Sequence, residues 1–371
     1  MTEASPFMEM ALEAARSVRG GHLANPWVGA VVVRDGVVIS TGSTEPPGGP
    51  HAEAAALAGI DARRATLYVT LEPCAAFEGK RTAPCADAIV QAGIARVAIA
   101  MEDPDPRVTG RGLEVLRAAG IDVEVGDGRD AAQQLLRPYF KHRQTGLPYV
   151  IGKFAASLDG KVATWRGDSK WITSAGARDL GHQQRSWVDA VLVGSGTVLV
   201  DDPALTARPQ GGLAGRQPVR IVADARGRTP ATAKLLREPG RAIVATTPAS
   251  SAEWRRSISE TGAQVVECER TEAGLNLRQL MLTLGQRNIV SVWTEGGGTL
   301  LGSLFDEELV DEVWAFIAPV IIGGEGLPAV GGSGVELIRD AWRLRDTVVE
   351  RVAQDILVRG HVGPWSPSGM D

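Results

Sequence analysis

The chain has 371 residues, 44% of them hydrophobic and 22% charged, with a formal net charge of −5 and a pI near 5.7. This length favours two domains, and the acidic balance argues against a nucleic-acid partner. The sequence has no run of about 18 apolar residues that could span a membrane, and its N-terminus lacks the apolar centre of a signal peptide. Three cysteines do not suggest a disulfide framework, so we expect a protein of the reducing cytoplasm.

The first part of the chain predicts a sheet between layers of helices. Apolar residues recur at helical spacing over 6–18, and two β-branched runs joined through Asp35 and Gly36 predict a hairpin. Further helices are expected at 51–58, 84–92, 111–119 and 129–142, and further strands at 66–71, 95–100 and 121–125. A hairpin followed by such alternation is typical of a sheet covered by helices.

Three potential metal ligands lie in this part of the chain: His51 in H-A-E, Cys74 in E-P-C and Cys85 in P-C. One imidazole and two thiolates form a ligand set of catalytic zinc, which leaves a fourth position for water. Glu53 would then lie beside that water and move its protons. The pattern H-x-E…P-C-x-x-C is a known signature of zinc deaminases. The alternative is a partly buried histidine with two inert core thiols.

The spacing of the two cysteines departs from that signature. Ten residues separate Cys74 from Cys85, where the short form has two. Zinc requires its ligands to meet in space and does not require them to be adjacent in sequence. A loop of this length closes at little entropic cost, so the longer spacing is compatible with the same site.

A break in the pattern at Q-T-G-L-P predicts a domain boundary, with domains at 1–145 and 146–371. The second domain begins with a strand that ends at Asp159-Gly160. Ser174 is expected to cap a helix, and residues 196–208 are expected to form a polar loop. Strands and helices then alternate up to a helix over 275–285 and a strand over 289–293.

A glycine-rich segment, T-E-G-G-G-T-L-L-G-S, follows that strand. Glycines between a strand and an apolar helix leave backbone N–H groups bare at the helix start, which suits a pyrophosphate. The spacing does not match G-x-G-x-x-G, so the common dinucleotide fingerprint is absent. A plain tight turn is the alternative. Residues 309–362 then alternate β-branched and polar residues, which predicts late antiparallel strands that could pair subunits, and we expect a homo-oligomer.

Several motifs in order resemble the bifunctional deaminase/reductases of riboflavin biosynthesis. They are N-P-W-V-G-A-V, H-A-E, T-L-E-P-C, P-C-A-D-A-I and D-P-D-P-R-V-T-G-R-G, and later K-F-A-A-S-L-D-G-K, S-K-W-I-T-S, G-T-V-L-V-D-D-P-A-L-T-A-R and T-E-G-G-G-T-L. The resemblance covers essentially the whole chain. It implies a two-domain α/β protein, with a cytidine-deaminase-like α/β/α sandwich followed by a dihydrofolate-reductase-like α/β domain.

The resemblance also implies an activity. It implies zinc-dependent deamination of a diamino-hydroxy-pyrimidine that carries a phosphoribosylamino group, and then reduction of the ribosyl group to ribityl by NADPH. The partner is then a small molecule, with no nucleic acid and no membrane. The cofactor would carry the hydride, while the protein would orient the reactants and supply charge.

Carried over by motif, the resemblance implies that His51, Cys74 and Cys85 bind zinc and that Glu53 transfers protons. Asn25 would contact the pyrimidine, although an Asn-Pro turn former is the alternative. The NADPH contacts would be Ala156, Trp171, Thr197, Asp201, Gly297, Gly298, Thr299, Leu300, Leu301, Gly302 and Ser303. The substrate contacts of the reductase would be Lys153, Ser169, Arg185, Leu205, Arg208 and Glu295, with the two arginines as a phosphate clamp. Lys153, Asp201 and Glu295 are candidates for proton and charge work near the sugar C1.

Thr44 and Ala76 stand where this family often has histidine, and the loop between the cysteines is longer than usual. Lys80 could restore positive charge toward a phosphate, or it could be a solvated loop residue. A reductase with a weakened or altered deaminase is therefore the alternative hypothesis. A deaminase of nucleic acids fits the acidic balance poorly, and a purely structural zinc fits Glu53 poorly.

Overall fold

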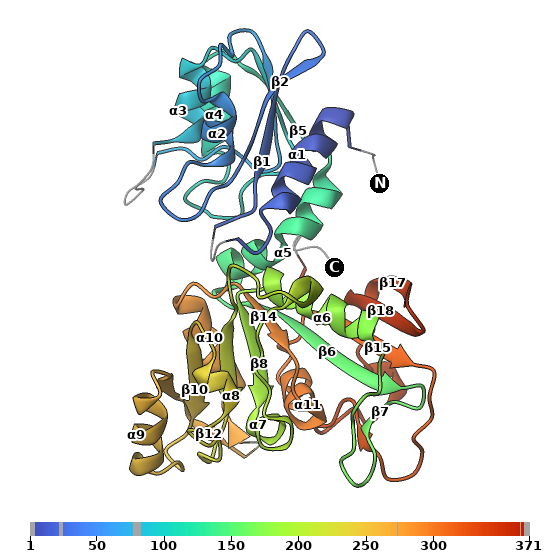
Figure 1. Ribbon diagram of the computed structural model, residues 1–371. Coiled ribbons are helices and arrows are strands. Elements are labelled where there is room, and N and C mark those ends of the chain that lie inside the picture. The colour runs from blue at the N-terminus through green and yellow to red at the C-terminus, as the bar shows by residue number, and fades with distance from the viewer. Residues whose placement is uncertain (1–3, 22–24, 77–82, 273, 364, 367–371) are drawn as a thin grey trace. The chain divides into compact units, whose positions relative to one another are not determined.

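The computed structural model forms two compact units, Met1–Gly146 and Leu147–Asp371 (Figure 1). It describes residues 4–21, 25–76, 83–272, 274–363 and 365–366. The chain leaves the first unit at Gly146, which caps a helix with φ 73°. Glycine adopts this left-handed conformation without a Cβ penalty, which explains why the helix ends there.

Within its described residues, the first unit has a five-stranded sheet with strand order β2-β1-β3-β4-β5. The strands are β1 (Gly29–Arg34), β2 (Val37–Ser43), β3 (Thr66–Val69), β4 (Arg96–Ile99) and β5 (Asp122–Val125). The helices are α1 (Pro6–Ser17), α2 (Ala52–Leu57), α3 (Cys85–Gln91), α4 (Arg111–Ala118) and α5 (Arg129–Thr145). Helices α1 and α5 cover one face of the sheet, and α2, α3 and α4 cover the other (Figure 1). The predicted α/β/α arrangement of this unit is confirmed.

The hairpin follows from its turn residues. Asp35 and Gly36 have φ values of 50° and 75°, the paired positive values that a type I′ turn requires. Strand β1 is antiparallel to β2 and β3, while β3, β4 and β5 are mutually parallel. The carboxyl ends of the three parallel strands therefore lie on one edge of the sheet.

The second unit has a nine-stranded sheet, among the residues described, in the order β11-β10-β9-β8-β14-β6-β15-β18-β17. The strands are β6 (Tyr149–Ser157), β8 (Ala190–Gly194), β9 (Val219–Ala223), β10 (Ala242–Thr246), β11 (Gln264–Glu267), β14 (Ser291–Thr294), β15 (Glu312–Ala318), β17 (Arg345–Val352) and β18 (Asp355–His361). Only β17 and β18 are antiparallel to their neighbours in this described part of the sheet. Short pairs form from β7 (Lys161–Ala163) with β16 (Leu327–Pro328) and from β12 (Arg270–Thr271) with β13 (Gly274–Leu275).

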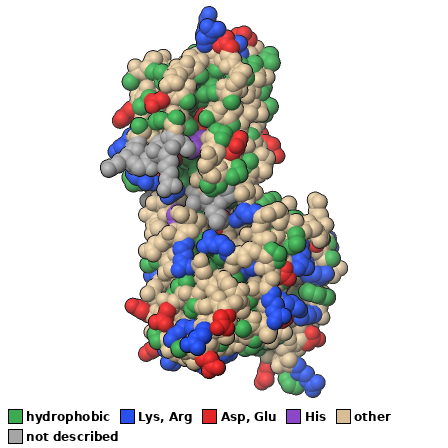
Figure 2. Space-filling model, turned by 60° about the vertical axis from the view of Figure 1, so that its left-hand side comes forward, with side chains coloured by type: hydrophobic (Ala, Val, Ile, Leu, Met, Phe, Trp, Pro, Cys, Tyr) green, Lys and Arg blue, Asp and Glu red, His purple; other side chains and the backbone are tan. Residues whose placement is uncertain are grey.

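Helices cover both faces of this sheet and divide its core into two clusters. The helices are α6 (Ala175–Trp187), α7 (Ser195–Asp201), α8 (Lys234–Arg237), α9 (Ala252–Glu260), α10 (Leu277–Gln286) and α11 (Gly298–Asp306), with 3₁₀ turns at Pro209–Gly211 and Ile338–Asp340. Helices α10 and α11 contribute to one cluster, and α6, α7, α8 and α9 contribute to the other. Acidic and basic side chains are interspersed over the face of this unit shown in Figure 2.

Two expectations for the second unit have clear outcomes. Ser174 caps α6, because its hydroxyl accepts a hydrogen bond from the backbone N–H of Ala177 at 3.3 Å. The expectation of a polar loop over 196–208 was wrong in its first half, where α7 occupies Ser195–Asp201. This helix has only 7 residues, which is too short to show a clear helical pattern in the sequence. Its residue Val198 is buried in the core.

The glycines of α11 are required for close backbone packing. A Cβ on Gly302 would lie 2.2 Å from the carbonyl carbon of Gly331, and one on Gly298 would lie 2.4 Å from the carbonyl oxygen of Pro328. Real Cβ atoms do not approach backbone so closely. Part of the glycine-rich segment therefore serves the packing of α11 against the segment that follows β16.

We expect the variant Gly302→Ala to be less stable by about 1–3 kcal/mol, because the added methyl group overpacks a backbone contact. Thermal or denaturant unfolding would measure this. Gly181→Ala in α6 is the matched control, since a Cβ there meets no atom within 4 Å. Alanine should stabilise that helix by up to about 1 kcal/mol. Equal stability of the two variants would contradict the packing role of Gly302.

Candidate active sites

The three predicted zinc ligands come together at the carboxyl edge of the first sheet. His51 is the N-cap of α2, Cys74 lies shortly after β3, and Cys85 is the first residue of α3. The Nδ1 atom of His51 lies 3.5 Å from the sulfur of Cys74 and 3.3 Å from that of Cys85. The three donor atoms all lie within 4.8 Å of one another. One nitrogen and two sulfurs at this separation fit a single tetrahedral zinc ion.

Two contacts adapt this cluster to a metal. The backbone N–H of Cys85 donates to the sulfur of Cys74 at 3.5 Å, and Val108 packs against both cysteines. A backbone N–H at the start of a helix favours the thiolate, which is the form that binds metal. The apolar contact limits access of solvent to the sulfurs.

Glu53 lies in the first turn of α2, two residues after His51, and is only 3% exposed. Burial raises the pKa of its carboxyl to about 7, with a further contribution from the sulfur of Cys74. A carboxyl that changes its charge near neutral pH can both accept and return a proton. None of the three donor atoms belongs to Glu53, so its carboxyl is available for proton transfer.

Glu72 connects the two motifs that surround the cluster. Its buried carboxylate accepts hydrogen bonds from the backbone N–H groups of Asp103, Gly110, Gly112 and Leu113 at 2.9–3.4 Å. It thereby caps α4 and fixes the loop before it. Burial raises its pKa in spite of these bonds. The turn that carries Cys74 is thus tied to the D-P-D-P-R-V-T-G-R-G segment.

The remaining predictions for the first unit concern Asn25, Thr44, Ala76 and Lys80. Asn25 is half-buried and precedes β1, and its contact with a pyrimidine stays a prediction. The hydroxyl of Thr44 accepts a hydrogen bond from the backbone N–H of Val28 at 3.1 Å, while Ala76 is exposed. Lys80 lies outside the described residues.

A cavity of about 790 Å³ lies at the carboxyl ends of the parallel strands of the second unit. This is within the usual range for small-molecule sites. It is lined by all six predicted substrate residues of the reductase: Lys153, Ser169, Arg185, Leu205, Arg208 and Glu295. It is also lined by six of the predicted cofactor residues: Trp171, Thr197, Asp201, Gly297, Thr299 and Leu300.

The other predicted cofactor residues, Ala156, Gly298, Leu301, Gly302 and Ser303, do not line this cavity. Ala156 and Leu301 are buried, at 0% and 1% exposed. Gly297 does point its backbone N–H toward the hydroxyl of Thr197, at 3.2 Å, and it caps α11. The N–H groups of Gly298 and Thr299, at the start of α11, have no carbonyl partner within the helix and are therefore the groups that a pyrophosphate would use, beside a cavity large enough for a nicotinamide and a sugar.

An ion pair between two side chains that are only 15% and 13% exposed lies in the wall of the cavity. The Nε atom of Arg185 donates to Oε1 of Glu295, and Nη2 donates to Oε2 at 2.7 Å. The indole N–H of Trp293 donates to the same carboxylate at 2.9 Å. Attraction from Arg185 and Lys153 outweighs burial and lowers the pKa of Glu295 to about 2. Glu295 is therefore ionised at neutral pH and contributes negative charge.

Lys153 is the second charged group in this wall. Burial lowers the pKa of its ammonium group, which Glu295 partly offsets. Its Nζ also lies 5.8 Å from the ring centre of Phe316. A lysine with a lowered pKa releases its proton more readily than an exposed one, so Lys153 can donate a proton inside the cavity.

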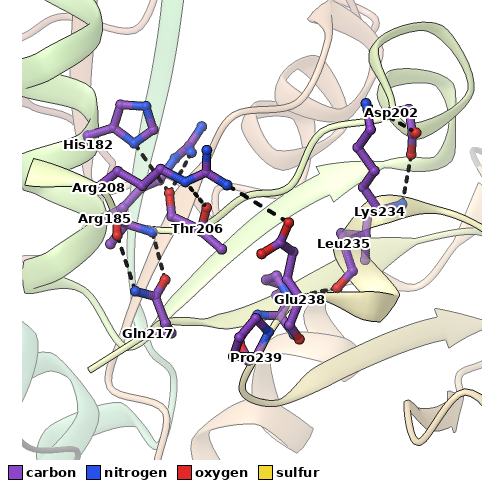
Figure 3. Close-up of polar contacts among 12 residues, drawn as sticks. His182, Arg185, Asp202, Thr206, Arg208, Gln217, Lys234, Leu235, Glu238 and Pro239 are labelled. Carbon is purple, nitrogen blue, oxygen red and sulfur yellow. Dashed lines mark hydrogen bonds and ion pairs between the residues drawn. The ribbon is translucent and has the colours of Figure 1, made fainter. Parts of the chain in front are cut away.

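Arg208 lies on the segment 202–208, which crosses beside α6 (Figure 3). Its Nε donates to the hydroxyl of Thr206 at 2.9 Å, and its Nη2 lies 3.8 Å from Glu238. Gln217 fixes the same segment through Ala207, by accepting from its N–H at 2.8 Å and donating to its carbonyl at 3.1 Å. The guanidinium of Arg208 is thereby held at the cavity with its Nη groups largely available.

Sequence reasoning did not single out Glu72 or His182, which the structure places in or beside the two sites. Glu72 stands within T-L-E-P-C, so the motif itself was a signal, but its partners lie about 30 to 40 residues further along the chain. His182 lines the reductase cavity from α6. Its position three residues before Arg185, on the same helical face, was the available signal.

The fold and the two sites define a class: a zinc deaminase domain joined to an α/β reductase domain with a nucleotide-cofactor cavity. Family models agree with both halves. Residues 1–101 match the cytidine and deoxycytidylate deaminase zinc-binding region, and residues 148–358 match the RibD C-terminal domain. The chain belongs to the RibD family.

Relatives and solved structures cover nearly the whole chain. The riboflavin biosynthesis protein RibD of Escherichia coli is 40% identical over 94% of this chain and 97% of its own length. That of Aquifex aeolicus is 40% identical over 95% and 96%. The structure of Acinetobacter baumannii RibD superposes with a TM-score of 0.83 at 37% identity, covering 96% of this chain and 98% of that one. A diaminohydroxyphosphoribosylaminopyrimidine deaminase/5-amino-6-(5-phosphoribosylamino)uracil reductase from Thermotoga maritima gives 0.82 at 34% identity, covering 97% and 98%.

We expect Cys85→Ser to bind much less zinc than the parent, which should hold about one ion per chain, because a hydroxyl is a poor substitute for a thiolate. Metal analysis after dialysis would measure this. Cys268→Ser is the control, since Cys268 is buried outside the ligand cluster. Equal zinc loss in both variants would show that the loss reflects folding and not ligation.

Proposed function

We propose that this protein deaminates a diamino-hydroxy-pyrimidine that carries a phosphoribosylamino group and then reduces the ribosyl group to ribityl with NADPH. As a RibD family member it acts in riboflavin biosynthesis, with hydrolase and oxidoreductase activities. The observation that carries the proposal is the convergence of His51, Cys74 and Cys85 beside the buried Glu53. The reductase cavity in the same chain supplies the second step.

In the deaminase step, His51, Cys74 and Cys85 would hold zinc, which when bound activates a water for attack on the ring carbon. Glu53 would accept a proton from that water and deliver it to the leaving amine. Its raised pKa suits both transfers. Asn25 would orient the pyrimidine, an assignment that rests on the family motif. Lys80, which lies outside the described residues, would supply positive charge toward the phosphate in place of the histidines that the family often has at positions 44 and 76.

In the reductase step, opening of the ribosylamine ring turns the ring oxygen into a hydroxyl and leaves an imine at the sugar C1, and NADPH when bound supplies the hydride for that carbon. The imine nitrogen then needs a proton to give the ribitylamine. Lys153 is the proposed donor, because its lowered pKa makes the ammonium group acidic. Glu295 stays ionised and would stabilise positive charge on the imine. Arg208 would bind the substrate phosphate.

The residues that line the cavity support a proposed placement of the cofactor. Thr197, Asp201 and Trp171 would line the nicotinamide side, and the backbone from Gly297 to Ser303 would approach the pyrophosphate. The bare N–H groups at the start of α11 support this assignment. Ala156 would act through its backbone, because its side chain is buried.

The alternative of a reductase with a weakened deaminase is not favoured. The zinc ligands and Glu53 are all present and brought together. Thr44, one of the positions that raised this alternative, makes a structural hydrogen bond to Val28. The domain assignment that we propose is deaminase for 1–145 and reductase for 146–371.

Glu53→Gln should lower deamination by at least about 10²-fold, because amide nitrogen and oxygen cannot shuttle a proton. Zinc content and the NADPH-dependent reduction of the previously deaminated intermediate should stay at the parent level. Separate assays of ammonia release and NADPH oxidation would measure the two steps. Loss of both activities together would contradict independent sites.

The outer strands suggest self-association. Val348, Val349 and Ile356 on β17 and β18 are 39%, 65% and 44% exposed, which is high for apolar side chains on a sheet. We propose that these strands contribute to a homo-oligomer.

We propose the cytoplasm as location, because three cysteines, two of them candidate metal ligands, suit a reducing compartment better than a disulfide framework. None of the described helices is both long and apolar enough to cross a membrane.

Light scattering of the native protein should therefore give a mass of at least a dimer. Replacing Val349 with Lys should shift the population toward monomer, because a buried charge at an interface is unfavourable. Val37→Lys on β2 is the matched control, since Val37 is 63% exposed in the other unit. A parent protein with the mass of one chain would exclude the oligomer.

A further inference from the structure

His182 is a cavity residue to which neither the sequence motifs nor the proposed function gives a role. It lies on α6, is half-buried, and lines the reductase cavity one turn before Arg185. Its Nδ1 lies 3.2 Å from the carbonyl oxygen of Thr206 (Figure 3). A carbonyl oxygen only accepts, so the hydrogen of the neutral imidazole is on Nδ1 and Nε2 carries a lone pair.

Thr206 connects His182 to the predicted substrate residues. Its carbonyl also accepts from Nη1 of Arg185 at 3.0 Å, and its hydroxyl accepts from Nε of Arg208 at 2.9 Å. Figure 3 shows His182, Arg185 and Arg208 gathered around this residue. Leu205, just before it, has a φ of 54°, which is costly for a leucine and needs support from its surroundings.

The charges in this part of the cavity are unequally available. Arg185 donates to Glu295 through two nitrogens and to Thr206 through the third, so its guanidinium is largely committed. Arg208 is 43% exposed at its side chain, and its ion pair with Glu238 spans 3.8 Å. A phosphate monoester carries about two charges and three acceptor oxygens, so a single arginine, which can donate to two of them, leaves room for a further donor.

We propose that His182 contacts the phosphate of the reductase substrate through Nε2, beside Arg208, and takes up a proton as the substrate binds. This inference rests on the proposed function and adds a residue to its phosphate site. Nε2 has no hydrogen-bond partner among the residues that the structure describes. It therefore faces the cavity free to bind a ligand.

The surrounding charges are consistent with proton uptake. Burial lowers the pKa of His182, and Arg185 and Arg208 lower it further, while Glu295 and the Thr206 carbonyl raise it. Arg178, one turn earlier on α6, lines the same cavity. A bound dianion would counter the arginines and favour the imidazolium, whose Nε2–H can then donate to a phosphate oxygen.

NADPH also carries phosphate groups, and they share this chemistry. Separate KM values distinguish the two sources. A contact with the substrate changes KM for the phosphorylated intermediate alone, whereas a contact with the cofactor changes KM for NADPH. His182 and Arg208 both contact Thr206, and Arg208 is a predicted substrate residue, which favours the substrate.

Two variants separate substrate contact from support of Thr206. In His182→Asn the amide nitrogen can replace Nδ1, so the bond to Thr206 is kept and the group at Nε2 is lost. In His182→Gln the amide nitrogen replaces Nε2, and the bond to Thr206 is lost. We expect His182→Asn to raise KM for the deaminated intermediate about tenfold, equivalent to about 1.4 kcal/mol. His182→Gln should recover most of this, with kcat and the KM for NADPH unchanged in both.

The pH dependence gives a second measurement. A protonated His182 binds phosphate better, so in the parent the KM for the intermediate should rise as pH increases through the pKa of His182 in the complex. Both variants should lose this rise. The phosphate itself becomes a dianion above about pH 6, but that trend is common to all three proteins and cancels in the comparison.

Calorimetry on the parent protein does not depend on either variant folding. Binding of ribose 5-phosphate, measured near neutral pH in two buffers with different protonation enthalpies, should show net proton uptake. No uptake, unchanged KM values in both variants, or recovery by Asn in place of Gln would overturn the role of His182. A parent that oxidises no NADPH with the intermediate would instead refute the proposed function, which is a distinct outcome.

Discussion

Both candidate sites depend on one constraint, that the carboxyl ends of parallel strands meet at a common sheet edge. In the first unit, Cys74 follows β3 and Asp103 follows β4. In the second unit, the cavity is bordered by the segments after β8 and β14, which carry Thr197 and Glu295. Side chains far apart in sequence are thereby placed within bonding distance of each other. Antiparallel strands would have alternated these ends and dispersed the groups.

Buried charge is the second property that the sites share. Glu53, Glu72, Lys153 and the Arg185–Glu295 pair are all withdrawn from water at an energetic cost that only specific partners offset. Glu72 is compensated by four backbone N–H groups, and Glu295 by Arg185 and Trp293. Burial raises the pKa of both Glu53 and Glu72, and that of Glu53 lies at about 7. A carboxyl in this range is suited to the proton exchange that the deaminase step requires.

Much of this could be predicted from the sequence, because local periodicity and turn residues determine where elements lie. The hairpin at Asp35-Gly36 and the cap at Ser174 are local and were predicted correctly, whereas α7 was missed because seven residues give little periodicity. The zinc ligands could be predicted from the sequence because their residue types, one histidine and two cysteines, restrict the chemistry of the site. The contacts of Glu72 and His182 could not be predicted in this way, since their partners become neighbours only after folding. The roles of Asn25 and Lys80 stay predictions.

The contact of Glu72 with α4 has an evolutionary consequence. A carboxylate that accepts from the backbone of residues 110 to 113 does not depend on the side chains at those positions. However, a Cβ at Gly112 would lie 2.0 Å from the carbonyl oxygen of Pro73. Glycine is therefore required at position 112 as long as the E-P-C turn keeps this conformation, and a homologue with a larger residue there should have a different turn.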